Sequence, residues 1–228
     1  MTDRPSFVRD NPDNPDEAFA ELYAQLPDVT DPQPWLGWAR QAKPPVLYLG
    51  IGTGRIAVPL SAAGIQLVGV DAHPGMLRRL AERLPTVELI QARIEDLDLD
   101  RRFDLVMVPS DILSTTPRLQ RAALHVAPGG RLAFEMMNPH WLKAVSHPGV
   151  RVRSMTPARV DMEVDYRLPD GSVRTQEAHD APLIWPEDVE PWLKTAGLRL
   201  ERLSGSGDGD LRTSATYYVL STKRPVRG

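Results

Sequence analysis

The chain has 228 residues, 42% hydrophobic and 25% charged, which is typical of a globular domain with one packed core. A net charge of −3 and a chain without cysteine argue against a nucleic acid partner, disulfides and thiolate metal sites. Histidines without metal-ligand spacing, and apolar runs well short of the roughly 20 residues of a membrane span, predict that the protein binds no metal and no membrane and is cytoplasmic.

The N-terminal segment, residues 1–43, is expected to form an arm and two helices that cover the core. Residues 1–16 are rich in Pro, Asn and Asp, which predicts a loose arm. From Glu17 onward apolar residues recur at helical spacing, and residues 35–39 offer a second apolar helix face.

The core, residues 44–228, alternates short apolar segments with helical patterns. Strands typical of burial on both faces are expected at Val46–Leu49, Gln66–Val70, Val87–Gln91, Phe103–Val108 and Arg131–Met137. Helices are expected at Arg55–Ala63, Pro74–Leu84 and Arg118–Val126. This alternation predicts an α/β fold with a doubly wound, mainly parallel, Rossmann-like sheet.

The pattern changes after Pro139. Three segments with one solvated face look like strands of an antiparallel lid, an insertion at about 150–182 that is either a lid or a homodimer surface. They are Val150–Met155, Arg159–Leu168 and Ser172–Ala178. A helix at Pro186–Ala196 and strands at Leu198–Leu203 and Ala215–Ser221 then complete a sheet of seven strands.

A glycine loop follows the first core strand and opens a helix, with the sequence Gly50-Ile51-Gly52-Thr53-Gly54. Glycines allow positive φ and a close approach of a ligand to the backbone. Arg55 occupies the position of the third glycine in the dinucleotide pattern GxGxxG, which disfavours NAD. Asp71 ends the second strand, where a carboxylate can accept hydrogen bonds from both ribose hydroxyls, so the loop and Asp71 together predict an adenosine site. The alternative role of Asp71 is a helix cap.

Four segments of the core carry the pattern of one known family. They are VLYLGIGTGR, GVDAHPGML, FDLVMVPSDIL and LHVAPGGRLAFEMMNP. They are similar to the first, second and fourth motifs and to the segment through strand five of the class I S-adenosylmethionine-dependent methyltransferases, so residues 46–138 resemble the core of that family, and the covered site suggests its small-molecule type. The resemblance implies S-adenosylmethionine as the cofactor.

The resemblance also implies a role for each matching residue. Gly50, Gly52 and Gly54 would lie under the methionine and ribose, Asp71 would hold the ribose, and Ala72 would pack on the adenine. Ile94 and Glu95 would lie near the adenine edge, and Pro109 and Ser110 would border the sulfonium and the acceptor.

Two positions depart from the family pattern. The family usually has an acidic residue where Tyr48 stands, and the Tyr48 hydroxyl is the candidate to replace its contact with the methionine end of the cofactor. It often has Asp where Arg93 stands, and Arg has no acceptor for the adenine amino group, so Glu95 or Asp96 is the candidate substitute. A lost acidic contact weakens cofactor binding by about 1 to 3 kcal/mol. These departures keep two alternatives open: a cyclase or isomerase with the same fold, and a ligand-binding module.

The predicted reaction is methyl transfer to N, O or C of a small-molecule acceptor, for example a natural-product intermediate, because the helices and lid imply a closed cavity rather than a basic groove. Transfer needs the acceptor atom aligned at about 3 to 3.5 Å, and a base helps a hydroxyl or carbon acceptor. The candidate catalytic residues are His140, with His147 as a second histidine after strand five, Tyr23 as a cover of the transfer site, and Asp111, which could orient an amine or accept a proton. Each also has a structural alternative, as a packing contact or a cap.

Overall fold

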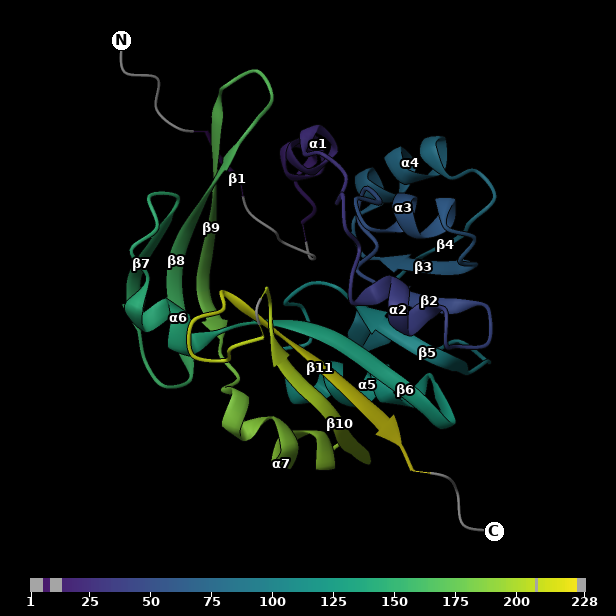
Figure 1. Cartoon of the computed structure of the whole chain (residues 1–228). Helices are drawn as coiled ribbons and strands as arrows, with labels where there is room; N and C mark the ends of the chain where they lie inside the picture. The colour runs from purple at the N-terminus through teal and green to yellow at the C-terminus, as the bar shows by residue number, and fades with distance from the viewer. Residues whose placement is uncertain (1–5, 9–13, 208, 225–228) are drawn as a thin grey trace.

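The main sheet of the computed structural model has seven strands in the order β10-β11-β6-β5-β2-β3-β4 (Figure 1). The structure describes residues 6–8, 14–207 and 209–224. The strands are β2 (Val46–Leu49), β3 (Leu67–Asp71), β4 (Glu88–Gln91), β5 (Phe103–Val108), β6 (Val126–Met137), β10 (Leu198–Gly205) and β11 (Thr216–Lys223). Only β11 is antiparallel to its neighbours within this sheet, which confirms the predicted doubly wound, mainly parallel fold.

Helices cover both faces of this sheet, because its central strands are apolar on both sides. All four residues of β2 are buried. Leu47 belongs to a cluster with side chains of α5 (Thr116–Leu124) and α7 (Val189–Lys194). Tyr48 belongs to the opposite cluster with side chains of α2, α3 and α4. These three helices are Trp35–Ala39, Ala57–Ala62 and Pro74–Arg83.

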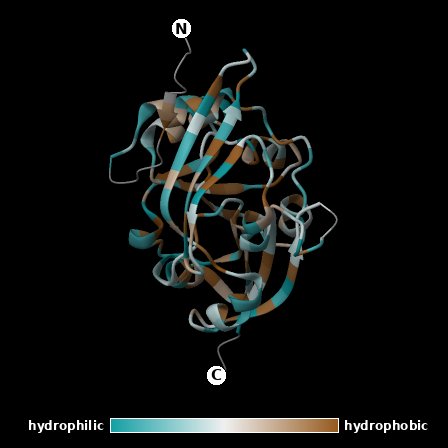
Figure 2. Cartoon of the chain, turned by 90° about the vertical axis from the view of Figure 1, so that its left-hand side faces the viewer, coloured by the Kyte–Doolittle hydropathy of each residue, from teal (hydrophilic) through white to brown (hydrophobic). Residues whose placement is uncertain are grey.

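A second sheet of four strands, in the order β1-β9-β8-β7, forms the lid beside the carboxyl ends of the core strands (Figure 1). Its strands are β1 (Ser6–Val8), β7 (Val150–Met155), β8 (Arg159–Arg167) and β9 (Val173–Pro182). Hydrophilic and hydrophobic residues alternate along them (Figure 2), as expected of strands with one solvated face. One apolar group of the lid packs with Leu142 of α6 (Pro139–Ala144), and Leu168, just after β8, packs with α1 (Glu17–Gln25).

Three features differ from the sequence-based expectation. Within the arm predicted for residues 1–16, Ser6–Val8 are docked as a strand that pairs in parallel with β9; residues 1–5 and 9–13 lie outside the described residues. Helix α6 is not predicted by the sequence pattern, and it begins after Asn138, whose side chain accepts a hydrogen bond from His140 N at 3.0 Å. The lid is a mixed sheet, since β1 adds a parallel strand to the antiparallel ones.

Within the described residues, no helix is both long enough and apolar enough to cross a membrane.

Candidate active site

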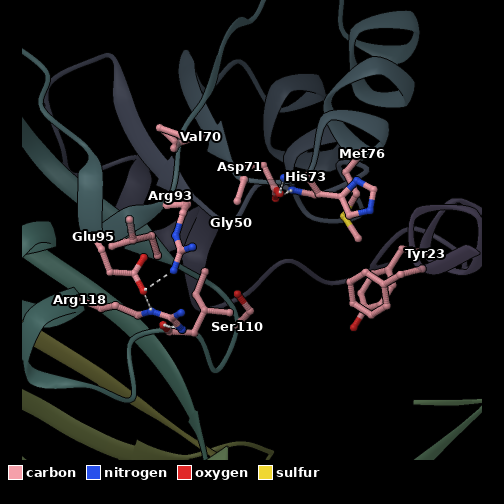
Figure 3. A pocket seen from close by; sticks show the side chains of 16 residues that line it. Tyr23, Gly50, Val70, Asp71, His73, Met76, Arg93, Glu95, Ser110 and Arg118 are labelled. Atoms are coloured by element: carbon pink, nitrogen blue, oxygen red, sulfur yellow. Dashed lines mark hydrogen bonds and ion pairs between the residues drawn. The ribbon is translucent and has the colours of Figure 1, made fainter. Parts of the chain in front are cut away.

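A pocket opens where the order of the sheet reverses. The chain runs outward from β2 through β3 to β4, and then crosses to β5 on the other side of β2. In doubly wound sheets this reversal leaves a crevice at the carboxyl ends of the strands. Residues of the loops after β2, β3, β4 and β5 line the pocket, together with side chains of α1 and α5 (Figure 3).

The floor of the pocket is the bare backbone of the glycine loop. Gly50 and Gly52 line the pocket and have φ of +70° and +56°. A Cβ on Gly50 would lie 2.4 Å from Ile112 Cδ1 and 3.4 Å from Ser110 Oγ, so the loop after β5 leaves no room for a side chain there. Gly54 serves packing instead, since its Cβ would lie 2.4 Å from Leu80 Cδ1 of α4.

Asp71 joins the loops after β2 and β3. Its Oδ2 accepts a hydrogen bond from Gly52 N and its Oδ1 accepts one from His73 N, both at 2.8 Å. A carboxylate offers about four acceptor positions, so a group oriented by these two bonds can accept further ones. The cap of α4 is His73, whose Nδ1 accepts from Gly75 N at 3.1 Å, and not Asp71.

One end of the pocket combines apolar walls with charged side chains. Ala72 and Ile94, two residues that the sequence analysis places near the adenine, both line it. Glu95 accepts a hydrogen bond from Arg118 Nε at 2.6 Å, and Arg93 Nη2 lies 3.9 Å from the same Glu95 oxygen (Figure 3). Burial is the largest single influence on the pKa of Glu95 and raises it, but the hydrogen bond from Arg118, a backbone hydrogen bond and the charges of Arg118 and Arg93 together hold the pKa below its usual value.

At two further residues near this end of the pocket, the structure differs from the sequence-based expectation. Asp96, the second candidate for the adenine contact, has a 75% exposed side chain and does not line the pocket. Arg118 does line it, and sequence reasoning missed this residue because α5 carries no motif that marks it. Arg118 Nη1 also donates to Ile112 O at 3.1 Å, so one guanidinium holds both Glu95 and the loop after β5.

Helix α1 closes the opposite side of the pocket, where Tyr23 faces Arg93, Glu95 and Arg118 across the cavity (Figure 3). The Tyr23 hydroxyl lies 3.3 Å from the Tyr166 hydroxyl of β8 and 3.4 Å from Gln176 Oε1 of β9. This contact brings the lid to the rim of the pocket.

A second contact, at its N-terminal end, holds helix α1 against the core. His73 Nδ1 acts as an acceptor in the α4 cap, so Nε2 carries the proton and donates to Asp16 O at 2.9 Å, at the start of α1. Helix α1 therefore connects the loop after β3 with the lid.

Besides Gly54, four predicted site residues do not line this pocket. Tyr48 is 4% exposed and packs in the cluster on the α2 side of the sheet. Pro109 only precedes the lining residue Ser110 in sequence. His140 Nε2 lies within hydrogen-bond distance of Glu187 Oε2, at 2.9 Å, and the His140 ring packs edge-on against a tryptophan ring after β9. Asp111 is the fourth, and its surroundings are unusual.

Asp111 is a buried acid with an incomplete set of hydrogen bonds. Its carboxylate accepts a hydrogen bond from the Met137 backbone, while its Oδ1 atom is buried and has no partner among the described residues. Burial, with a smaller contribution from Glu135, raises the pKa of Asp111 to about 7. Burial also raises the pKa of Glu135 to about 7, although the Thr216 hydroxyl donates to it. Glu135 was missed at the sequence level, where the one signal is an acid within an otherwise apolar strand.

Replacing Asp111 with Asn is expected to change how stability depends on pH. Between about pH 4 and 7 the folded parent holds a proton on Asp111 that the unfolded chain has released, so rising pH destabilises the parent but not the variant. From pH 4 to 8 the free energy of unfolding of the parent should therefore fall, relative to that of Asp111→Asn, by on the order of 3 kcal/mol. Urea denaturation at several pH values measures it, with Glu88→Gln as a control; a pH-independent difference would contradict the assignment.

The sheet reversal, the glycine floor and the carboxylate at the end of β3 define a nucleoside-binding doubly wound protein. Comparison with known proteins gives the family. Residues 46–130 match a family model described as a methyltransferase domain. The chain is 31% identical over 192 residues to a ubiquinone biosynthesis O-methyltransferase of Azorhizobium caulinodans, covering 77% of this chain and 70% of the relative.

Two further proteins resemble the chain over most of its length. A cypemycin N-terminal methyltransferase of a Streptomyces species is 28% identical over an aligned length of 232, which covers 90% of this chain and 95% of the relative. The solved structure of an S-adenosylmethionine-dependent methyltransferase from Clostridium acetobutylicum has the same fold, with a TM-score of 0.70 at 18% identity over 91% of this chain and 98% of that one. The chain belongs to the class I S-adenosylmethionine-dependent methyltransferases, and S-adenosylmethionine is its cofactor.

The residues present fit the nucleoside part of that cofactor. The bare backbone of Gly50 and Gly52 lines the pocket, the oriented Asp71 carboxylate suits ribose hydroxyls, and Ala72 and Ile94 offer apolar surface for a base. At the methionine end Tyr48 gives no such support, because its side chain packs in the core.

Proposed function

We propose that the protein transfers a methyl group to a small-molecule acceptor. The observation that carries this proposal is the enclosure of the pocket: α1 and the lid meet through Tyr23 and Tyr166 beside it. An acceptor must therefore fit between the core and the lid. The names of the relatives agree, since one belongs to ubiquinone biosynthesis and another methylates the N-terminus of cypemycin.

The site residues take their roles from this placement. Asp71 holds the ribose, Gly50 and Gly52 let the cofactor lie on the backbone, and Ala72 and Ile94 flank the adenine. Glu95, fixed by its bond from Arg118, is assigned to the adenine amino group in place of the acid that Arg93 replaces. S-adenosylmethionine supplies a methyl group already activated on a sulfonium, so the chain has to position the acceptor and exclude water.

Tyr23 and Ser110 line the pocket from opposite elements, and we assign both to the edge of the transfer site. Pro109, Gly54 and Tyr48 act indirectly, through the geometry of the loops that they support. His140 as a general base stays a prediction, as do a homodimer through the lid and the absence of a nucleic acid partner.

Calorimetry followed by a transfer assay tests the proposed function. We expect binding of S-adenosylmethionine and of S-adenosylhomocysteine to the full chain, and label in the product when labelled methyl donor is incubated with candidate acceptors. Binding without any transfer of label would favour the cyclase or isomerase alternative. Absence of binding to both compounds would leave only the ligand-binding module.

A further inference from the structure

Three polar side chains from distant parts of the sequence meet between helix α1 and the lid. Tyr23 lies on α1, Tyr166 on β8 and Gln176 on β9. Gln176 Oε1 accepts a hydrogen bond from the Tyr166 hydroxyl at 3.1 Å and a longer one from the Tyr23 hydroxyl at 3.4 Å, and the two hydroxyl oxygens lie 3.3 Å apart. Because Tyr23 also lines the pocket, this tyrosine–glutamine cluster stands at the rim of the pocket.

The two lid residues of the cluster belong to the inner face of the lid. Successive side chains of a strand point to opposite faces. Asp165 and Thr175, the neighbours of Tyr166 and Gln176 along their strands, bond to each other at 2.8 Å on the other face. The inner face continues with Val164, which is paired with Gln176 and packs in the apolar group around α6. Tyr166 and Gln176 therefore face α1 and the core.

The hydrogen bonds of the cluster fix the orientation of the Gln176 amide. Its oxygen accepts from both tyrosine hydroxyls, and among the described residues none accepts a hydrogen bond from its nitrogen, Nε2. A primary amide carries two donor hydrogens on this nitrogen. A ligand that covers the amide has to supply an acceptor for it, since a donor that is shielded from water and left unpaired costs free energy. An oxygen atom of the ligand meets this requirement.

The part of the pocket next to α1 is lined by uncharged side chains. His73 and Met76 lie on the same side of the pocket as Tyr23 (Figure 3), and Phe19 of α1 completes this wall. His73 is neutral, because Nδ1 accepts a hydrogen bond while Nε2 donates one. The charged residues that line the pocket are those assigned to the ribose and base side: Asp71, Arg93, Glu95 and Arg118. A charged group held next to α1 would find no counter-ion in this wall, so an uncharged ligand is favoured there.

Aromatic rings lead from the pocket to the cluster. The centroids of Phe19 and Tyr23 lie 4.8 Å apart, and those of Tyr23 and Tyr166 lie 5.8 Å apart. These rings are tilted by 50° and 51° against each other. Tilted rings at this spacing offer faces and edges on which a further flat ring can pack. The wall thus suits a ring, and the amide beside it suits an oxygen on that ring.

We propose that Tyr23, Tyr166 and Gln176 form the acceptor subsite, and that this subsite takes an uncharged, ring-containing molecule whose oxygen accepts a hydrogen bond from the Gln176 amide. This inference rests on the proposed function and adds the substrate class to it. Gln176 is the residue that selects the acceptor by its oxygen. Tyr166 is a positioning residue, because it acts through the orientation of the amide.

Three probes of similar shape test the subsite. Acetophenone carries a ketone oxygen, 2-phenylpropene has a methylene group in its place, and 1-phenylethylamine carries an ammonium group at pH 7. Each probe is titrated by NMR into the full chain saturated with S-adenosylhomocysteine at this pH. We expect acetophenone to bind at least tenfold more tightly than either of the other two probes.

Variants of the cluster separate selection of the acceptor from a role in holding the lid. Gln176→Glu keeps an oxygen for both tyrosine hydroxyls but replaces the amide donor with a second acceptor. It should bring the affinity ratio of acetophenone to 2-phenylpropene close to one and strengthen the binding of 1-phenylethylamine, whereas a residue that only holds the lid would leave the ratio unchanged. Tyr166→Phe removes the shorter bond to the amide oxygen and should lower the ratio in part.

Gln41→Glu is the matched control. The exposed Gln41 accepts a hydrogen bond from Arg131 Nη1 at 3.2 Å through Oε1, so this variant undergoes the same chemical change outside the pocket and should keep the ratio. Retained binding of S-adenosylhomocysteine shows that each variant is folded.

The outcomes separate the two proposals. Failure of the parent chain to bind S-adenosylhomocysteine would overturn the proposed function. If S-adenosylhomocysteine binds normally, absent or equal binding of acetophenone and 2-phenylpropene would overturn only the acceptor inference. The same conclusion would follow if the parent preferred 1-phenylethylamine, or if the preference for acetophenone survived in Gln176→Glu.

Discussion

Replacing Asp71 with Ala is expected to lower the affinity for S-adenosylhomocysteine at least tenfold, which corresponds to about 1.4 kcal/mol. The variant loses the carboxylate that we assign to the ribose hydroxyls. It also loses the acceptor that orients Gly52 and His73 through two bonds of 2.8 Å. Isothermal titration calorimetry measures the change.

Two further variants separate the loss of the carboxylate charge from the loss of the acceptor that orients the backbone of Gly52 and His73. Asp71→Asn keeps a side-chain oxygen for one of the backbone donors but loses the charge, so we expect a smaller loss of affinity than in Asp71→Ala. Asp170→Ala removes an acid from the turn between β8 and β9 and should bind S-adenosylhomocysteine as the parent does. Unchanged affinity in Asp71→Ala would rule out the ribose role.

The parts of the fold that could be predicted are those encoded by local pattern. The alternation of buried strands and helices fixes the parallel sheet, and glycines with positive φ must follow β2 for the loop to turn so tightly. For the same reason the pocket residues close to these loops, Gly50, Gly52, Asp71 and Ala72, could be named from the sequence.

The remaining parts depend on contacts between distant segments. Ser6–Val8 form a strand only because β9 supplies their hydrogen-bond partners, and a three-residue segment has no periodicity of its own to reveal this. Helix α6 is similarly short, and its cap by Asn138 resembles an ordinary turn in the sequence.

Placement of single side chains was the least predictable feature. Tyr48 lies two residues after Val46 in β2, so both side chains point to the same face of the sheet, toward α2. Tyr48 therefore does not point to the end of the strand where the cofactor binds. Asp111 and Glu135 are separated by a helix and most of a strand in the sequence, and only the pairing of β5 with β6 brings them together. Arg118 reaches the pocket because α5 runs beside the loop after β5.

Replacing Gly50 with Val is expected to lower the affinity for S-adenosylhomocysteine at least a hundredfold, which corresponds to about 2.7 kcal/mol. The new Cβ would lie 2.4 Å from Ile112 Cδ1, so the glycine loop and Ile112, which both line the pocket, have to shift. Valine at a φ of +70° also costs about 1 to 3 kcal/mol of stability. Calorimetry and denaturant unfolding separate the two losses.

Gly197 offers a matched control for the backbone strain. It has the same φ of +70° and follows α7, and a Cβ added to it would meet no atom within 4 Å. Gly197→Val should therefore lose stability to a similar degree and keep its affinity for S-adenosylhomocysteine. If Gly50→Val bound within threefold of the parent, the cofactor would not rest on this loop, because the shift that valine forces on the loop and on Ile112 would disturb any ligand in van der Waals contact with the Gly50 backbone.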